Sequence, residues 1–130
     1  MMAEKLPRPT NAELAILKAI WEQGPSTVRQ VHEALDDSSA KSYTTTLKLM
    51  QIMAEKGLLV RDESQRTHVY QASRPAEKTQ RQLLTDLADR AFGGSTCNLV
   101  MNALASSKAS AEELREIRQL IDQLDKEIQP

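Results

Sequence analysis

A run of short polar side chains in the middle of the chain carries groups that could bind a nucleic acid. Residues 38–54 read SSAKSYTTTLKLMQIMA, with two lysines and no acidic residue. At about 100° per residue, a helix over this stretch has a hydrophobic side made of Tyr43, Leu47, Met50 and Ala54, with Thr46 and Met53 at its margin. The other side carries hydroxyl, amide and ammonium groups and, at its far end, one carboxylate, on Lys41, Thr44, Thr45, Lys48, Gln51 and Glu55. With Ser42 at the helix start, all of these except Glu55 are candidate contact residues.

This polar side suits a helix that lies in the major groove of DNA. Hydroxyls and amides can hydrogen-bond to the edges of bases, whereas lysines and the positive helix N-terminus attract phosphates. An ordinary solvated face with threonines near a helix start would look the same. The polar side alone does not choose between these two interpretations, so the flanking sequence has to decide.

The sequence before this helix predicts two further helices that begin at capping boxes. Thr10-Asn11-Ala12-Glu13 opens the first helix, which ends at Gly24-Pro25, and Thr27-Val28-Arg29-Gln30 opens the second. A polar turn at residues 36–39 follows, and Gly57 is typical of the end of the polar-faced helix. A short helix, a turn and a polar-faced helix in this order predict a helix-turn-helix, whose second helix enters the major groove.

Two short strands follow the helix-turn-helix, over residues 58–62 and 67–72, and residues 63–66 join them. A hairpin in this place is the wing of a winged-helix domain. Arg66, near the tip, could enter a minor groove or contact the DNA backbone. An exposed hairpin arginine without a partner is the simpler alternative. We include Arg66 among the DNA-binding candidates because the helices before it favour that interpretation.

The last part of the chain predicts a helical arm. A third capping box, at residues 110–113, precedes hydrophobic residues with the spacings three, four, three and four of a heptad seam, which Leu120 widens. The seam consists of Leu114, Ile117, Leu120, Ile121, Leu124 and Ile128. Because a chain this small has little surface to cover it, we expect residues 75–130 to form a dimerisation domain and residues 1–74 the DNA-binding domain. Packing of the seam against its own chain is the alternative.

The composition of the chain argues against several other classes of protein. It has 130 residues, a formal net charge of -1 and one cysteine, so no intramolecular disulfide can form and a cytoplasmic location fits. No hydrophobic run is long enough to insert into a membrane. The two histidines lie on different predicted elements, and neither a paired metal-ligand spacing nor a glycine-rich phosphate loop is present. We therefore expect no catalytic, metal or cofactor site. A protein-docking module remains open beside a DNA-binding protein.

Three segments of the chain carry a family resemblance: AELAILKAIWEQGPSTVRQVHEAL, YTTTLKLMQIMAEKGLLVRDESQRTHVYQA and AFGGSTCNLVMNAL. They resemble the penicillinase-repressor family of bacterial transcription repressors, the BlaI/MecI/CopY type, from about Thr10 to Ile128. The resemblance implies an N-terminal winged helix and a C-terminal helical arm that dimerises. It also implies repression from a palindromic operator of double-stranded DNA.

The resemblance further implies a way of releasing the repressor. In the β-lactam branch of the family, a membrane metalloprotease sensor detects the drug, and the repressor is then cut in its arm after the asparagine of a motif like Leu-Val-Leu-Asn-Phe. The corresponding stretch here is Leu99-Val100-Met101-Asn102-Ala103, which makes the bond between Asn102 and Ala103 a candidate cleavage site. The sensor or its effector is then an implied partner. Cys97 alone does not match the cysteine-rich tail of the copper-responsive branch.

Overall fold

Local hydrogen bonds set the limits of the first helix, α1. In the computed structural model, which describes residues 8–35 and 42–128, α1 spans Asn11–Gln23. The Thr10 hydroxyl accepts a hydrogen bond from the Glu13 backbone N–H at 3.2 Å, and the Glu13 carboxylate accepts one from the Thr10 backbone N–H at 2.9 Å. Gly24 ends the helix with a φ of 82°, which glycine adopts without steric cost. The predicted capping box therefore forms.

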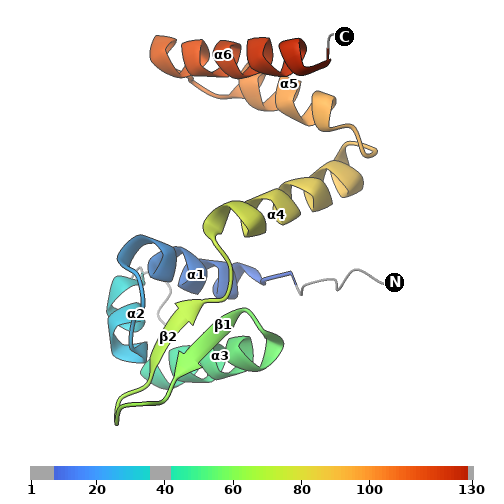
Figure 1. Cartoon of the computed structure of the whole chain (residues 1–130). Helices are drawn as coiled ribbons and strands as arrows, with labels where there is room; N and C mark the ends of the chain where they lie inside the picture. The colour runs from blue at the N-terminus through green and yellow to red at the C-terminus, as the bar shows by residue number, and fades with distance from the viewer. Residues whose placement is uncertain (1–7, 36–41, 129–130) are drawn as a thin grey trace. The chain divides into compact units, whose positions relative to one another are not determined.

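The described residues form six helices and one two-stranded hairpin (Figure 1). After α1 come α2 (Val28–Ala34), α3 (Tyr43–Lys56), β1 (Leu59–Asp62), β2 (Val69–Ala72), α4 (Ala76–Ala91), α5 (Thr96–Ser106) and α6 (Ala111–Ile128). The strands are antiparallel, with Leu59 opposite Ala72 and Asp62 opposite Val69. The predicted fold class, mainly α with a small β-hairpin wing, is confirmed.

The chain divides into two compact units, residues 1–84 and 85–130, and α4 contributes to both. In the first unit, α1, α2, α3 and the hairpin enclose one core. That core is mostly aliphatic, and consists of Ile16, Leu17, Ala19, Ile20, Val28, Val31, Met50, Met53, Leu59 and Tyr70. Aromatic residues make up only 3% of the chain, so the core depends on aliphatic and methionine side chains.

The hairpin is attached to the helices by backbone hydrogen bonds. The Ser26 N–H, between α1 and α2, donates to the Tyr70 carbonyl at 2.9 Å, and the Tyr70 N–H donates back to the Ser26 carbonyl at 2.8 Å. The Tyr70 side chain is buried in the core. These contacts hold β2 between β1 and the α1–α2 turn, so the base of the wing has a fixed position beside α3.

The second unit contains α5, α6 and the end of α4. The Ser110 hydroxyl accepts a hydrogen bond from the Glu113 N–H at 3.0 Å, and the Glu113 carboxylate accepts one from the Ser110 N–H at 3.0 Å, so the third capping box also forms before α6. No residue of α6 is buried. In the described part of the chain, no helix is long and hydrophobic enough to cross a membrane.

Candidate nucleic-acid interface

α3 presents its predicted polar side to solvent. The exposed candidates on it are Ser42, Thr44, Thr45, Lys48 and Gln51. Lys41, the remaining candidate of this group, lies outside the described residues. Thr44, Lys48 and Gln51 are four and three residues apart, so they share one stripe along the helix. A hydroxyl, an ammonium group and an amide thus follow one another along the surface of α3, as in a helix that reads a DNA groove.

The buried side of α3 differs from the predicted one. Thr46 and Met53, expected at its margin, are fully buried together with Met50, whereas Tyr43 is 41% exposed. Tyr43 lies in the first turn of α3, where its ring meets the side chains of α2 instead of the core. Its ring and the His32 ring meet in a T-shaped arrangement, with 5.8 Å between ring centroids, and the Arg29 guanidinium lies 5.6 Å from the Tyr43 centroid.

A buried polar contact holds α2 and α3 together. A hydrogen bond of 2.9 Å joins His32 Nδ1 and Thr46 Oγ1, and Thr46 is 1% exposed. A buried hydroxyl without such a partner would be costly, so this contact favours one arrangement of the two helices. His32 thus helps to fix how α3 packs against α2, on the side of α3 opposite its exposed stripe.

Ser42 begins α3. Its hydroxyl oxygen accepts a hydrogen bond from the Thr45 backbone N–H at 3.2 Å and lies 3.1 Å from the Thr45 hydroxyl. The predicted contact residue Ser42 is therefore also the N-cap of α3. The positive end of the helix dipole lies at this N-terminus, where it would favour a phosphate.

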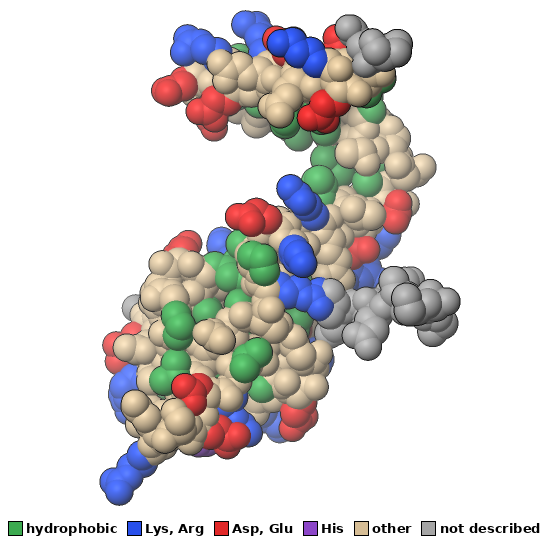
Figure 2. Space-filling view, viewed as in Figure 1, with side chains coloured by type: hydrophobic (Ala, Val, Ile, Leu, Met, Phe, Trp, Pro, Cys, Tyr) green, Lys and Arg blue, Asp and Glu red, His purple; other side chains and the backbone are tan. Residues whose placement is uncertain are grey.

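A groove of about 500 Å³ brings Gln51 and Arg66 to one surface. It lies between α2, α3 and the hairpin, and its lining includes the three basic side chains Arg29, Arg61 and Arg66. Figure 2 shows a basic side chain that protrudes at the outer end of the hairpin. Because cations gathered in a groove attract polyanions, this lining would favour DNA phosphates beside the α3 stripe.

Arg29 and Arg61 were not selected from the sequence. Arg29 is an ordinary surface residue of a short helix until the fold places it over Tyr43. Arg61 lies in β1, where every residue after Leu59 is exposed, and its place on a strand of the wing is the signal that could have identified it. A hydrogen bond with the Tyr70 side chain and the nearby Glu63 carboxylate raise the pKa of Arg61.

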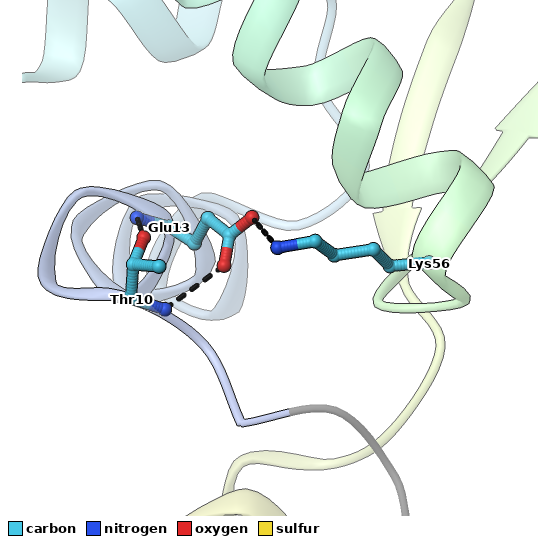
Figure 3. Close-up of polar contacts among 3 residues, drawn as sticks. All are labelled: Thr10, Glu13 and Lys56. Carbon is cyan, nitrogen blue, oxygen red and sulfur yellow. Dashed lines mark hydrogen bonds and ion pairs between the residues drawn. The ribbon is translucent and has the colours of Figure 1, made fainter.

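An ion pair anchors the other end of α3. Lys56 Nζ lies 2.8 Å from Glu13 Oε2, and Figure 3 shows Lys56 reaching from α3 to Glu13 in α1. Burial raises the pKa of Glu13, but the hydrogen bonds from Lys56 and Thr10 together lower it by more than burial raises it. The pKa of Glu13 therefore lies below its ordinary value. The carboxylate thereby joins the cap of α1 to the last turn of α3.

The predicted seam of α6 lies at the surface. Leu120 is 56% exposed, Ile121 55% and Ile128 81%, while Leu114 and Leu124 are also exposed and Ile117 is half-buried. Such a continuous hydrophobic stripe on one helix favours a helical partner. Figure 2 shows acidic and basic side chains elsewhere on α6, as expected of an amphipathic helix.

The candidate cleavage site lies within α5. Asn102 and Ala103 are both exposed. The Asn102 side-chain amide donates to the Asn98 backbone carbonyl at 2.9 Å and lies 3.0 Å from the Asn98 side-chain oxygen. The Asn102 side chain is therefore hydrogen-bonded to the preceding turn of α5. Among the described residues, no group of three or more histidine, cysteine and acidic side chains could hold a metal ion.

Comparison with known proteins identifies the family. Residues 9–123 match the family model described as the penicillinase repressor. A transcriptional regulator BlaI of Mycobacterium tuberculosis is 29% identical over 123 residues, which are 93% of this chain and 88% of that protein. A penicillinase repressor of Bacillus licheniformis is 24% identical over 120 residues, which are 92% of this chain and 94% of that protein.

A solved structure of a MarR family protein from Bacillus stearothermophilus can be superimposed over 92% of this chain and 74% of that protein's chain, with 20% identity and a TM-score of 0.46.

The match to the penicillinase repressor family extends over the winged helix and nearly all of the helical arm, so it favours a DNA-binding regulator over an enzyme. The resemblance found in the sequence is confirmed, and the chain belongs to the penicillinase repressor family of transcriptional regulators.

Proposed function

We propose that this protein represses transcription as a homodimer that occupies a palindromic operator and leaves it on an inducing signal. Family membership makes it a DNA-binding transcriptional repressor. In the proposal, residues 1–74 bind DNA and residues 75–130 dimerise, in the cytoplasm. The observation that carries it is that the exposed stripe on α3 ends at Gln51, which also lines the groove that holds Arg29, Arg61 and Arg66.

The proposed contacts divide by chemistry. Thr44 and Gln51 contact base edges, because hydroxyls and amides can donate and accept hydrogen bonds. Lys48 and Arg66 contact phosphates, and Arg66 reaches the backbone or a minor groove from the wing. The proposal keeps three further contacts at the start of α3, namely Lys41, Ser42 and Thr45. Arg29 and Arg61 add cations beside them.

The dimer is proposed from the exposed seam. Fully burying an exposed leucine or isoleucine side chain contributes roughly 1.5–3 kcal/mol, and each copy offers five exposed side chains of this kind on α6, beside the half-buried Ile117. Association costs an estimated 4–15 kcal/mol, which is of the same order as the gain from burying these partly exposed side chains on two copies. Two-fold symmetry then predicts half-sites about one helical turn, or a multiple of it, apart.

The operator test uses the DNA upstream of the protein's own gene. Saturable retardation in a gel by that DNA, with competition by the same fragment and none by a scrambled one, is the expected result. No retardation even at low salt would contradict the proposal. Equal retardation of both fragments would leave only the sequence-independent phosphate contacts that any basic surface makes.

The dimer test uses one charge on the seam. Ile121→Asp places a carboxylate among hydrophobic side chains and should shift the protein from dimer to monomer in sedimentation velocity. Gln119→Asp, which adds the same charge to an exposed position of α6 off the seam, is the control and should stay dimeric. A wild-type protein that sediments as a monomer at operator-binding concentrations would refute the homodimer.

Release is proposed to follow proteolysis of the arm, by a membrane metalloprotease sensor or its effector. Cutting between Asn102 and Ala103 would separate α6 from the winged helix and so remove the linked second half-site. Mass spectrometry of the protein from cells relieved of repression by a β-lactam should find a fragment that ends at Asn102. Relief of repression with the protein still intact would exclude this step.

A further inference from the structure

The segment that leads from the hairpin into α4 is tied to two different helices. The Ser73 backbone N–H donates to the Leu58 carbonyl at 3.1 Å, and the Ser73 hydroxyl donates to the Gly57 carbonyl at 2.6 Å. The carbonyl of the next residue, Arg74, accepts a hydrogen bond from the Trp21 indole N–H at 3.2 Å. Two consecutive residues thus connect to the end of α3 and to α1.

The tie to α3 is made at its C-terminal cap. Gly57 adopts the left-handed conformation, with φ 87° and ψ 11°. The Gly57 N–H donates to the Ala54 carbonyl at 3.2 Å, and the Leu58 N–H donates to the Met53 carbonyl at 2.9 Å, which is a Schellman motif. Because this motif fixes the two carbonyls that Ser73 contacts, Ser73 is held in place by the DNA-facing helix itself.

The start of α4 continues the constraint. Pro75 has a fixed φ and no N–H, and it restricts the backbone of Arg74 before it. Thr79, one turn into α4, is 6% exposed and shares a small hollow with Leu17 and Gly57. The hydrogen bonds of Ser73 and Arg74 and the burial of Thr79 therefore remove the freedom that a flexible linker would have.

We propose that Ser73 and Trp21 are positioning residues that set the direction in which α4 leaves the winged helix, and thereby the half-site spacing that the dimer accepts. The inference rests on the proposed function, because spacing has meaning only for a dimer on two half-sites. A stiff connection concentrates the second winged helix at one separation, whereas a loosened one spreads it over several. Neither side chain contacts DNA in the proposed complex.

The test measures the affinity of the full-length protein for three kinds of DNA. One is the operator, the second is a single half-site, and the third is a series in which the half-site separation changes in steps of one base pair. Loss of one hydrogen bond in Ser73→Ala or Trp21→Phe should weaken operator binding about three- to tenfold. The spacing profile should broaden, and half-site affinity should stay within about twofold of wild type.

Two further variants separate positioning from a general loss of structure. Ser73→Thr keeps the hydroxyl and should keep the wild-type spacing profile. Ser106→Ala removes a comparable hydroxyl bond, of 2.8 Å to the Asn102 carbonyl, and should leave the profile sharp. If the Ser73→Ala and Trp21→Phe proteins keep the wild-type spacing profile, this inference is overturned, but the proposal that the protein binds as a dimer is not. A wild-type protein that binds operator and half-site equally would overturn the proposed dimer, and this inference with it.

Discussion

Replacing Lys56 by methionine should destabilise the winged helix more than replacing Glu13 by glutamine, although both changes break the same ion pair. Lys56→Met leaves a carboxylate that is 1% exposed with only its bond from the Thr10 N–H. Glu13→Gln leaves an ammonium group on a side chain that is 38% exposed and can be hydrated, and glutamine can still accept the Thr10 bond.

The expected sizes follow from this asymmetry. Removing one partner of a buried pair costs about 3–5 kcal/mol, and the remaining Thr10 bond and the partial exposure of Lys56 reduce this to roughly 2–3 kcal/mol for Lys56→Met. Glu13→Gln should cost about 1.5 kcal/mol, the low end for one hydrogen bond to a charged group, because Lys56 is partly exposed. Glu63→Gln breaks an exposed pair with Arg61 and, as the control, should cost less than about 0.5 kcal/mol.

The pH dependence gives an independent check. The pKa of Glu13 in the folded protein is lower than its ordinary value of 4.5. The unfolded state therefore binds the proton more tightly, and the pair stabilises the fold fully only above pH 4.5. This stabilisation is lost as the pH falls from 4.5 through the folded pKa. The difference in stability between wild type and Lys56→Met should accordingly shrink below pH 4.5.

Urea unfolding, followed by fluorescence of the single tryptophan in α1, measures these differences in free energy. The double variant completes a cycle, and its coupling energy should be about 1–2 kcal/mol. The reasoning is refuted if Lys56→Met costs no more than Glu13→Gln, or if the difference between wild type and Lys56→Met is the same at pH 7 and at pH 4.

Three further predictions concern the DNA surface. Lys48→Ala should reduce the slope of log affinity against log salt by about one unit, and an unchanged slope would mean that Lys48 touches no phosphate. Glu55→Gln removes an exposed negative charge that lies one turn beyond Gln51 on α3. It should tighten DNA binding about threefold in a fluorescence anisotropy titration at low salt, because the carboxylate repels phosphates. Weaker binding by the variant would contradict a position of Glu55 facing the phosphates. Arg29→Ala should weaken binding to operator DNA and to scrambled DNA about equally, roughly three- to tenfold, because a phosphate contact carries no sequence information. Weaker binding to the operator alone would mean that Arg29 contacts bases.

Features that depend on neighbours in the chain were predictable from the sequence. The capping boxes at Thr10, Thr27 and Ser110 each form from residues three positions apart, whatever the rest of the fold does. The heptad spacing of α6 likewise follows from helical periodicity alone. For the same reason the hairpin and the exposed stripe on α3 could be predicted, because strand alternation and helix periodicity are local patterns.

The contacts that position α3 could not be predicted in this way. The Glu13–Lys56 pair joins residues 43 apart, and the Trp21–Arg74 bond joins residues 53 apart. Periodicity also placed Tyr43 in the core, whereas packing of α2 against α3 leaves it at the surface under Arg29. The sequence by itself determined which helices form and which sides are hydrophobic. Only the tertiary structure decided which of those sides meet, because that choice depends on the shape and polar contacts of segments distant in the chain.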